Sequence, residues 1–183
     1  MSRAEERIEM KTKNLVLMAM LIAVGTALYL VIPGINGGMK PDFMLTMMFI
    51  GIFLFPDARS VFLLAITTGV ISGLFSSFPL GFFPNIIDKF ITAFVIFAIV
   101  IAVKKITSNL IASTLLVGFG TLISGTIFLS VAIFILGVEL PFSFLFVTVV
   151  LPAIAMNGIA FFIINPIVIK VMERTSFSKS ITN

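Results

Sequence analysis

The chain has 183 residues, of which 60% are hydrophobic and only 11% are charged, and its net charge is +4. Soluble domains carry about 25% charged residues, so this composition excludes an ordinary soluble domain. Histidine and cysteine are both absent, which excludes disulfides, H-E-x-x-H zinc sites and Ser-His-Asp triads, and we expect no enzyme, no metal site and no cofactor.

Uncharged runs fill most of the chain and predict membrane-spanning helices. They cover residues 14–39, 43–56, 60–87, 90–103, 106–138 and 140–169. Four of these runs exceed the roughly 20 residues that cross a bilayer. Backbone groups in lipid must be satisfied within the segment, which favours helices, and the alternation of outer-membrane barrel strands is absent.

We therefore expect an all-α integral membrane protein with a six-helix membrane domain over residues 14–172. A charged segment, 1–13, precedes this domain, and a tail, 173–183, follows it. The first apolar run is too long for a signal peptide and lacks a clear cleavage site, so we expect it to be retained. The spans are expected at about 14–33, 41–56, 60–78, 85–103, 109–136 and 143–169.

The basic residues predict the orientation. If the N-terminus is cytoplasmic, ten of the 12 Lys and Arg residues lie inside, and only Lys40 and Lys89 lie outside. This is a strong positive-inside bias, so we expect both termini in the cytoplasm of a bacterium and the chain in its plasma membrane. The same asymmetry accounts for the net charge without a nucleic-acid partner.

The first span carries small residues at helical spacing. Ala19, Ala23 and Ala27 share one face, which allows another helix to pack closely. Two interpretations remain open: packing within the protein's own bundle, or docking on a partner membrane protein.

The segment Gly37-Gly38-Met39-Lys40-Pro41-Asp42 leads into a short second run. The 14 residues of 43–56 cover about 21 Å, less than the roughly 30 Å hydrocarbon core. Counting back from Asp57 and Arg59 therefore places Lys40 and Asp42 below the outer surface, and the helix is expected to begin at Pro41. Intramembrane charges typically mark a solute path; alternatively, Lys40 extends to the headgroups and pairs with Asp42.

The fourth run gives a second pair of charges at the same depth. Counting back from Lys104 and Lys105 reaches Asn85, so Asp88 and Lys89 are also expected inside the membrane. Alternatively, Asn85 is a helix N-cap and Asp88 its acidic third residue. The aromatic residues Phe82 and Phe83, just before, suit either a flat apolar ligand or an interfacial belt.

The last span carries Asn157, which we expect to reach an outward-open cavity, and Asn165, which we expect to be structural. The nearest approach to a P-loop, from Gly120 to Thr126, lacks the lysine and lies in an apolar run. An ATP motor would therefore be another chain.

Three segments resemble the TrpP family, which contains tryptophan transport proteins of the S-component class in energy-coupling factor transporters. They are Gly37-Gly-Met-Lys-Pro-Asp-Phe-Met-Leu-Thr-Met-Met-Phe49, Pro84-Asn-Ile-Ile-Asp-Lys89 and Leu151-Pro-Ala-Ile-Ala-Met-Asn157. The resemblance implies a six-helix subunit that binds its solute from outside and works with a transmembrane scaffold and two cytoplasmic ATPases. The spacing of Ala19, Ala23 and Ala27 is similar to the A-x-x-x-A motif that S components present to the scaffold.

Tryptophan is a zwitterion with a flat aromatic side chain. We expect Lys40 or Lys89 to face its carboxylate and Asp42 or Asp88 its ammonium, with Asn85 in the same site. Phe82, Phe83 and Asn157 would then hold the indole. The alternatives are an S component for another aromatic or vitamin-like solute, or a small secondary transporter that acts as an oligomer.

Overall fold

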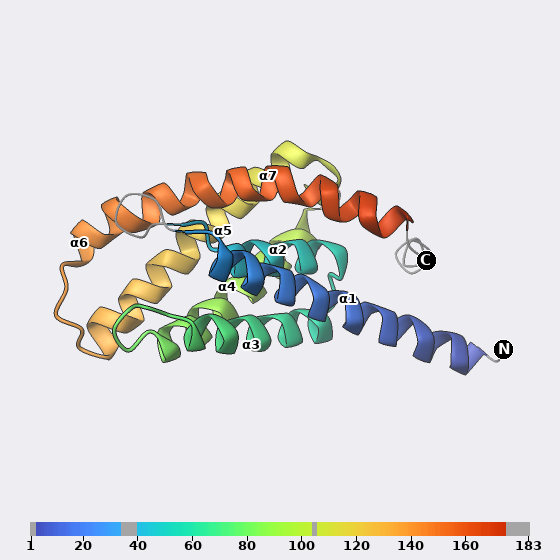
Figure 1. Cartoon of the computed structure of the whole chain (residues 1–183), viewed down its shortest axis with the longest axis horizontal. Coiled ribbons are helices and arrows are strands. Elements are labelled where there is room, and N and C mark those ends of the chain that lie inside the picture. Colours follow the sequence, from blue (N-terminus) through green and yellow to red (C-terminus); the bar gives the residue numbers. More distant parts are fainter. Residues whose placement is uncertain (1–2, 34–39, 104–105, 175–183) are drawn as a thin grey trace.

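Figure 1 shows the protein, a computed structural model, as a bundle of helices packed side by side. The structure describes residues 3–33, 40–103 and 106–174, and every regular element in these ranges is helical. Gly37, Gly38, Met39, Lys104, Lys105 and residues 175–183 lie outside this part of the chain. The helices are α1 (Arg3–Val31), α2 (Phe43–Leu54), α3 (Ala58–Leu74), α4 (Phe82–Ala102), α5 (Leu110–Ser130), α6 (Phe142–Leu145) and α7 (Leu151–Arg174).

Three shorter helical turns complete the described chain. A 3₁₀ turn, η1 (Ile106–Ser108), precedes α5. A π-helical turn, η2 (Val131–Ile135), extends α5, and a second one, η3 (Phe146–Val150), joins α6 to α7. These turns continue the helices. As a result, α5 and η2 form one long rod, and α6, η3 and α7 together form another.

Four rods are long and apolar enough to cross a bilayer: Thr12–Val31, Phe82–Ala102, Leu110–Ile135 and Phe142–Arg174. Two further apolar helices, Phe43–Leu54 and Ala58–Leu74, are shorter. At 1.5 Å per residue, the 12 residues of α2 cover about 18 Å. The prediction of an all-helical protein is confirmed for the described residues, and four of the rods have the length and composition of membrane spans.

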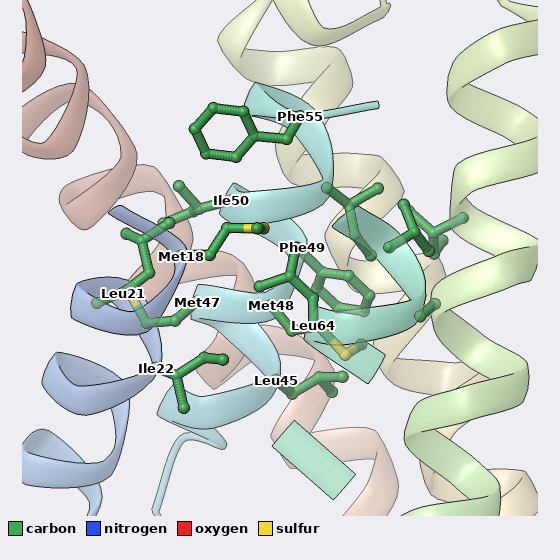
Figure 2. Packing of buried hydrophobic residues seen from close by; sticks show 14 of the residues in the cluster. Met18, Leu21, Ile22, Leu45, Met47, Met48, Phe49, Ile50, Phe55 and Leu64 are labelled. Atoms are coloured by element: carbon green, nitrogen blue, oxygen red, sulfur yellow. The ribbon is translucent and has the colours of Figure 1, made fainter. Parts of the chain in front are cut away.

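The short helix α2 is the centre of the bundle. All residues from Phe43 to Ile52 are buried, as expected for a helix that is apolar on every side. Figure 2 shows Met18, Leu21 and Ile22 on the side of α1 that faces α2. Gly25 permits this contact, because a Cβ atom there would lie 2.9 Å from Cγ of Met47.

Helices α3 and α4 pack with their backbones in contact. A Cβ atom at Gly69 would lie 2.9 Å from Cα of Ile86, so only glycine allows this approach. The close packing brings the first turns of α4 against the core. As a result, Asp88 and Lys89 are buried, with 0% and 2% of their surfaces exposed.

The two ends of the bundle differ. α1 and α3 end, and α2, α4 and α6 begin, at one end (Figure 1), which we call the cavity end. The first residues of α1 and α3 and the last residues of α7 lie at the other end. Arg59, Lys170 and Arg174 therefore lie far from the cavity end.

Two predicted helix starts are wrong. α2 begins at Phe43 rather than Pro41, because the carboxylate of Asp42 accepts the N–H of Leu45 and caps the helix. α4 begins at Phe82 with Gly81 as its N-cap, so Asn85 is not the capping residue. Asp88 consequently lies in the second turn of α4 and has no capping role.

Candidate functional site

A cavity of about 670 Å³ lies at the cavity end of the bundle. This volume is within the range of about 300–1,000 Å³ that is typical of small-molecule sites. Its walls come from α1, α2, α3, the α3–α4 connection, α4, α5 and α7. Six residues predicted from the sequence line it: Lys40, Asp42, Asn85, Asp88, Lys89 and Asn157.

Asp42 precedes the first residue of α2, and its two carboxylate oxygens have different partners. One oxygen, Oδ1, accepts the N–H of Leu45 at 2.9 Å. The other, Oδ2, lies 2.9 Å from Nζ of Lys89. The side chain of Asp42 remains 32% exposed, so its carboxylate is accessible from the cavity.

Lys89 lies between two carboxylates in the interior. Its Nζ is 2.8 Å from Oδ2 of Asp88 and 3.4 Å from Oγ of Ser124. Oδ1 of Asp88 accepts a hydrogen bond from the hydroxyl of Thr92 at 3.2 Å. Each buried charge thus has charged or polar partners, without which its desolvation would be strongly unfavourable.

Asp42, Lys89 and Asp88 form a cluster, the acidic triad, in which two carboxyl groups share one lysine ammonium. A partly exposed carboxylate beside a low-dielectric interior favours a cationic ligand. Because Asp42 is the exposed member, the triad is suited to bind an ammonium group through that carboxylate.

Lys40 contacts Tyr29, so the alternative in which Lys40 pairs with Asp42 is not observed. Its Nζ donates to the backbone carbonyl of Tyr29 at 2.6 Å and lies 3.6 Å from the centre of the Tyr29 ring. Both residues line the cavity. Lys40 is therefore a cation at the cavity wall that is held by the end of α1, and it is suited to bind an anionic group.

The two asparagines are bonded to the protein itself. Oδ1 of Asn157 accepts the backbone N–H of Asp42 at 2.7 Å, and Nδ2 donates to the hydroxyl of Thr121 at 3.1 Å. Nδ2 of Asn85 donates to the carbonyl of Gly81 at 2.7 Å. Asn157 thus connects α7 to α2 and α5 at the cavity wall.

The predicted aromatic residues do not line the cavity. Phe82 and Phe83 pack against each other with ring centres 5.4 Å apart, and Phe83 is 61% exposed. The aromatic rings on the cavity wall are instead those of Tyr29, Phe78 and Phe128. Phe78 and Phe128 meet edge to face, with 5.1 Å between ring centres and an interplanar angle of 78°.

The face of α1 with small residues points away from the bundle. Ala19, Ala23 and Ala27 are all exposed, whereas Gly25 is buried against α2. The interpretation that these alanines pack within the protein's own bundle is therefore wrong. Large apolar side chains, among them Val16, Met20 and Val24, are exposed beside them.

The described residues contain no group of three or more Asp and Glu side chains that could hold a metal ion. The arrangement offers one cation, one accessible carboxylate and aromatic walls, which together complement a zwitterion with an aromatic side chain.

Comparison with known proteins identifies relatives over nearly the whole chain. The family model described as "Tryptophan transporter TrpP" matches residues 11–173. A "Probable tryptophan transport protein" of Bacillus subtilis (strain 168) is 47% identical over 171 residues, which are 93% of this chain and 99% of that protein. A protein of the same name from Clostridium perfringens (strain 13 / Type A) is 33% identical and covers 90% of this chain and 96% of its own length. No solved structure gives a significant match.

Proposed function

Because the chain belongs to the TrpP family of tryptophan transporters, we propose that it is the high-affinity tryptophan-binding subunit of an energy-coupling factor transporter. It is a multi-pass protein of the bacterial plasma membrane. In the proposed assembly it binds tryptophan from outside and works with a transmembrane scaffold and two cytoplasmic ATPases.

The observation that carries the proposed binding mode is the separation of charge at the cavity. Lys40 is held by Tyr29, and Asp42 is held by Lys89. The ammonium of tryptophan bonds to the partly exposed carboxylate of Asp42. The carboxylate of tryptophan bonds to Lys40. Asp88 and Lys89 are almost fully buried. Their proposed role is to hold the carboxylate of Asp42 in position through the Asp42–Lys89–Asp88 contacts.

The indole is proposed to lie against the aromatic and sulfur-containing part of the wall. Phe78 and Phe128 present ring edges and faces, which favour offset or edge-to-face contacts with another ring. Met44 also lines the cavity, and its sulfur accepts a hydrogen bond from the hydroxyl of Ser72 at 3.2 Å. A fixed, polarisable sulfur is a favourable neighbour for an aromatic ring.

The proposed topology has six spans with both termini in the cytoplasm. The four long rods and the two shorter helices α2 and α3 supply the spans. Lys40 lines the cavity. The start of α3, which carries Arg59, and the end of α7, which carries Lys170 and Arg174, lie at the opposite end of the bundle (Figure 1). The positive-inside rule therefore supports a cytoplasmic location for the opposite end and an outward-facing cavity.

The alanine face of α1 is proposed to dock on the scaffold subunit. Ala19, Ala23 and Ala27 are exposed along one side of a span, where small residues allow another helix to approach closely. The sequence carries no P-loop motif, so the proposed energy source is ATP hydrolysis by separate ATPase chains.

Equilibrium binding to the purified chain tests this proposal. Tryptophan is expected to bind more tightly than other amino acids and vitamins, and to be retained by the chain without ATPase subunits. Preference for another aromatic or vitamin-like solute would change the substrate assignment. Uptake by the chain alone in liposomes, without scaffold and ATPases, would instead favour a secondary transporter.

A further inference from the structure

The last turn of α1 contains a carbonyl that has no partner within the helix. In an α-helix the carbonyl of residue 29 accepts the N–H of residue 33. Residue 33 is Pro33, which has no backbone N–H. The preceding bond is formed normally, since the N–H of Ile32 donates to the carbonyl of Leu28 at 3.0 Å.

Lys40 replaces the missing donor. Its Nζ donates to the carbonyl of Tyr29 at 2.6 Å and lies 3.6 Å from the centre of the same residue's ring. A cation at a helix C-terminus is favourable because it bonds the last carbonyls and opposes the negative end of the helix dipole. The ring face adds a cation–π attraction. The carbonyl and the ring of Tyr29 thus together fix the position of the Lys40 ammonium.

The bond to Tyr29 leaves Lys40 able to bind a ligand. A lysine ammonium carries three N–H donors, and the Tyr29 carbonyl takes one of them. Lys40 and Tyr29 both line the cavity. A long, flexible side chain that is already held in place loses less conformational entropy when a ligand binds.

We propose that Pro33 and Tyr29 are positioning residues that hold Lys40 where the carboxylate of the solute binds. Pro33 acts by withholding an N–H, so that the Tyr29 carbonyl remains available to Lys40. This inference rests on the proposed function, because it assumes that the solute is an amino acid whose carboxylate bonds to Lys40.

Binding of two ligands to Pro33→Ala tests the inference. Alanine supplies an N–H that competes with Lys40 for the Tyr29 carbonyl. Tryptophan affinity is expected to fall about three- to tenfold, the effect of one side chain that must be ordered on binding. Tryptamine, which has the same indole and ammonium but no carboxylate, is expected to keep its affinity. Pro141→Ala is the matched control, because Pro141 is exposed and does not line the cavity.

A second background separates positioning from a general effect on folding. In Lys40→Met protein, adding Pro33→Ala is expected to cause no further loss of tryptophan affinity. Tyr29→Leu keeps the carbonyl but removes the ring, and should also weaken tryptophan binding more than tryptamine binding. The inference would be overturned if Pro33→Ala lowered the affinities for tryptophan and tryptamine equally. It would also be overturned if adding Pro33→Ala to Lys40→Met protein lowered tryptophan affinity as much as it does in the unmodified protein. If the unmodified protein binds no tryptophan, the proposed function fails instead.

Discussion

Nζ of Lys89 lies 2.9 Å from Oδ2 of Asp42, so a buried lysine of α4 is joined to the carboxylate that caps α2. This bond couples the buried part of the bundle to the cavity wall. Any change in Lys89 therefore acts on both the stability of the fold and the charge of the site.

Removal of the Lys89 ammonium is expected to destabilise the protein strongly. Lys89→Met leaves the carboxylates of Asp42 and Asp88 without their shared cation, and breaking a buried ion pair costs about 3–5 kcal/mol. Thermal or denaturant unfolding of the purified protein in detergent measures this loss. Lys170→Met is the control, because Lys170 is exposed at the opposite end, and it should change stability by less than about 0.5 kcal/mol. Equal stability of the two variants would contradict the role of Lys89.

Asp42→Asn separates ammonium binding from helix capping. Asparagine caps a helix about as well as aspartate, but it lacks the negative charge. Tryptophan affinity is expected to fall about 10- to 100-fold, which corresponds to the 1.5–3 kcal/mol of a hydrogen bond to a charged group. Isothermal titration or fluorescence competition measures this change.

The chain offers a matched control for Asp42. Asp57 caps α3 in the same way, with Oδ1 accepting the N–H of Ser60 at 3.0 Å, and it lies at the opposite end of the bundle. Asp57→Asn should leave tryptophan affinity unchanged. Indole-3-propionate, which lacks the ammonium, should bind the Asp42→Asn variant as well as it binds the unmodified protein. A similar loss for both ligands would show that Asp42 acts only on structure.

The proximity of the charged residues could be predicted from the sequence. The lengths of the uncharged runs, measured from the charges expected in the cytoplasm, predict one common level for Lys40, Asp42, Asp88 and Lys89, and the structure brings all four to one cavity. This part depends only on helix rise and bilayer thickness. The position of Asn157 on the same cavity follows from similar counting.

The partners of these charges could not be predicted, because they depend on contacts between distant segments. Lys40 and Asp42 are close in the sequence, which suggested a pair as one alternative. Lys40 instead donates to the carbonyl of Tyr29, which Pro33 leaves available. Asp42 pairs with Lys89, which requires the close packing of α4 against the core. Proline lacks a backbone N–H, and the position of Pro33 just after α1 therefore predicts an orphan carbonyl in the last turn of that helix.

The aromatic wall was missed for a similar reason. Phe78 and Phe128 come from the α3–α4 connection and from α5, and no spacing in the sequence relates them. The chain has 21 phenylalanines, so the residue type alone carries little information. Phe82 and Phe83 lie in the aromatic-rich stretch between the third and fourth expected spans, which suggested a ligand contact, but Phe83 in the first turn of α4 has 61% of its surface exposed.

Alanine substitution of the cavity phenylalanines tests which rings hold the indole. Phe78→Ala and Phe128→Ala are each expected to weaken tryptophan binding by about three- to tenfold or more, because an aromatic pair contributes about 0.5–1.5 kcal/mol beyond its buried area. Phe83→Ala removes an equally large ring that lies outside the cavity lining and should leave the affinity unchanged. If Phe83→Ala weakened tryptophan binding and Phe78→Ala did not, the indole would have to bind near Phe83 rather than in the cavity.

Bulk on the exposed face of α1 is expected to block transport without affecting solute binding. Ala19→Trp and Ala23→Trp each place a large ring where a partner helix would pack closely. Neither residue lines the cavity, so tryptophan affinity of the isolated protein should be unchanged. Uptake into cells or proteoliposomes that contain the scaffold and ATPases should fall to background.

Ile163→Trp is the control, because Ile163 is 57% exposed on α7 and lies outside the alanine face. Unimpaired uptake by both alanine variants would show that the scaffold docks elsewhere, and equal loss for Ile163→Trp would show that any added bulk in the membrane-facing surface is harmful.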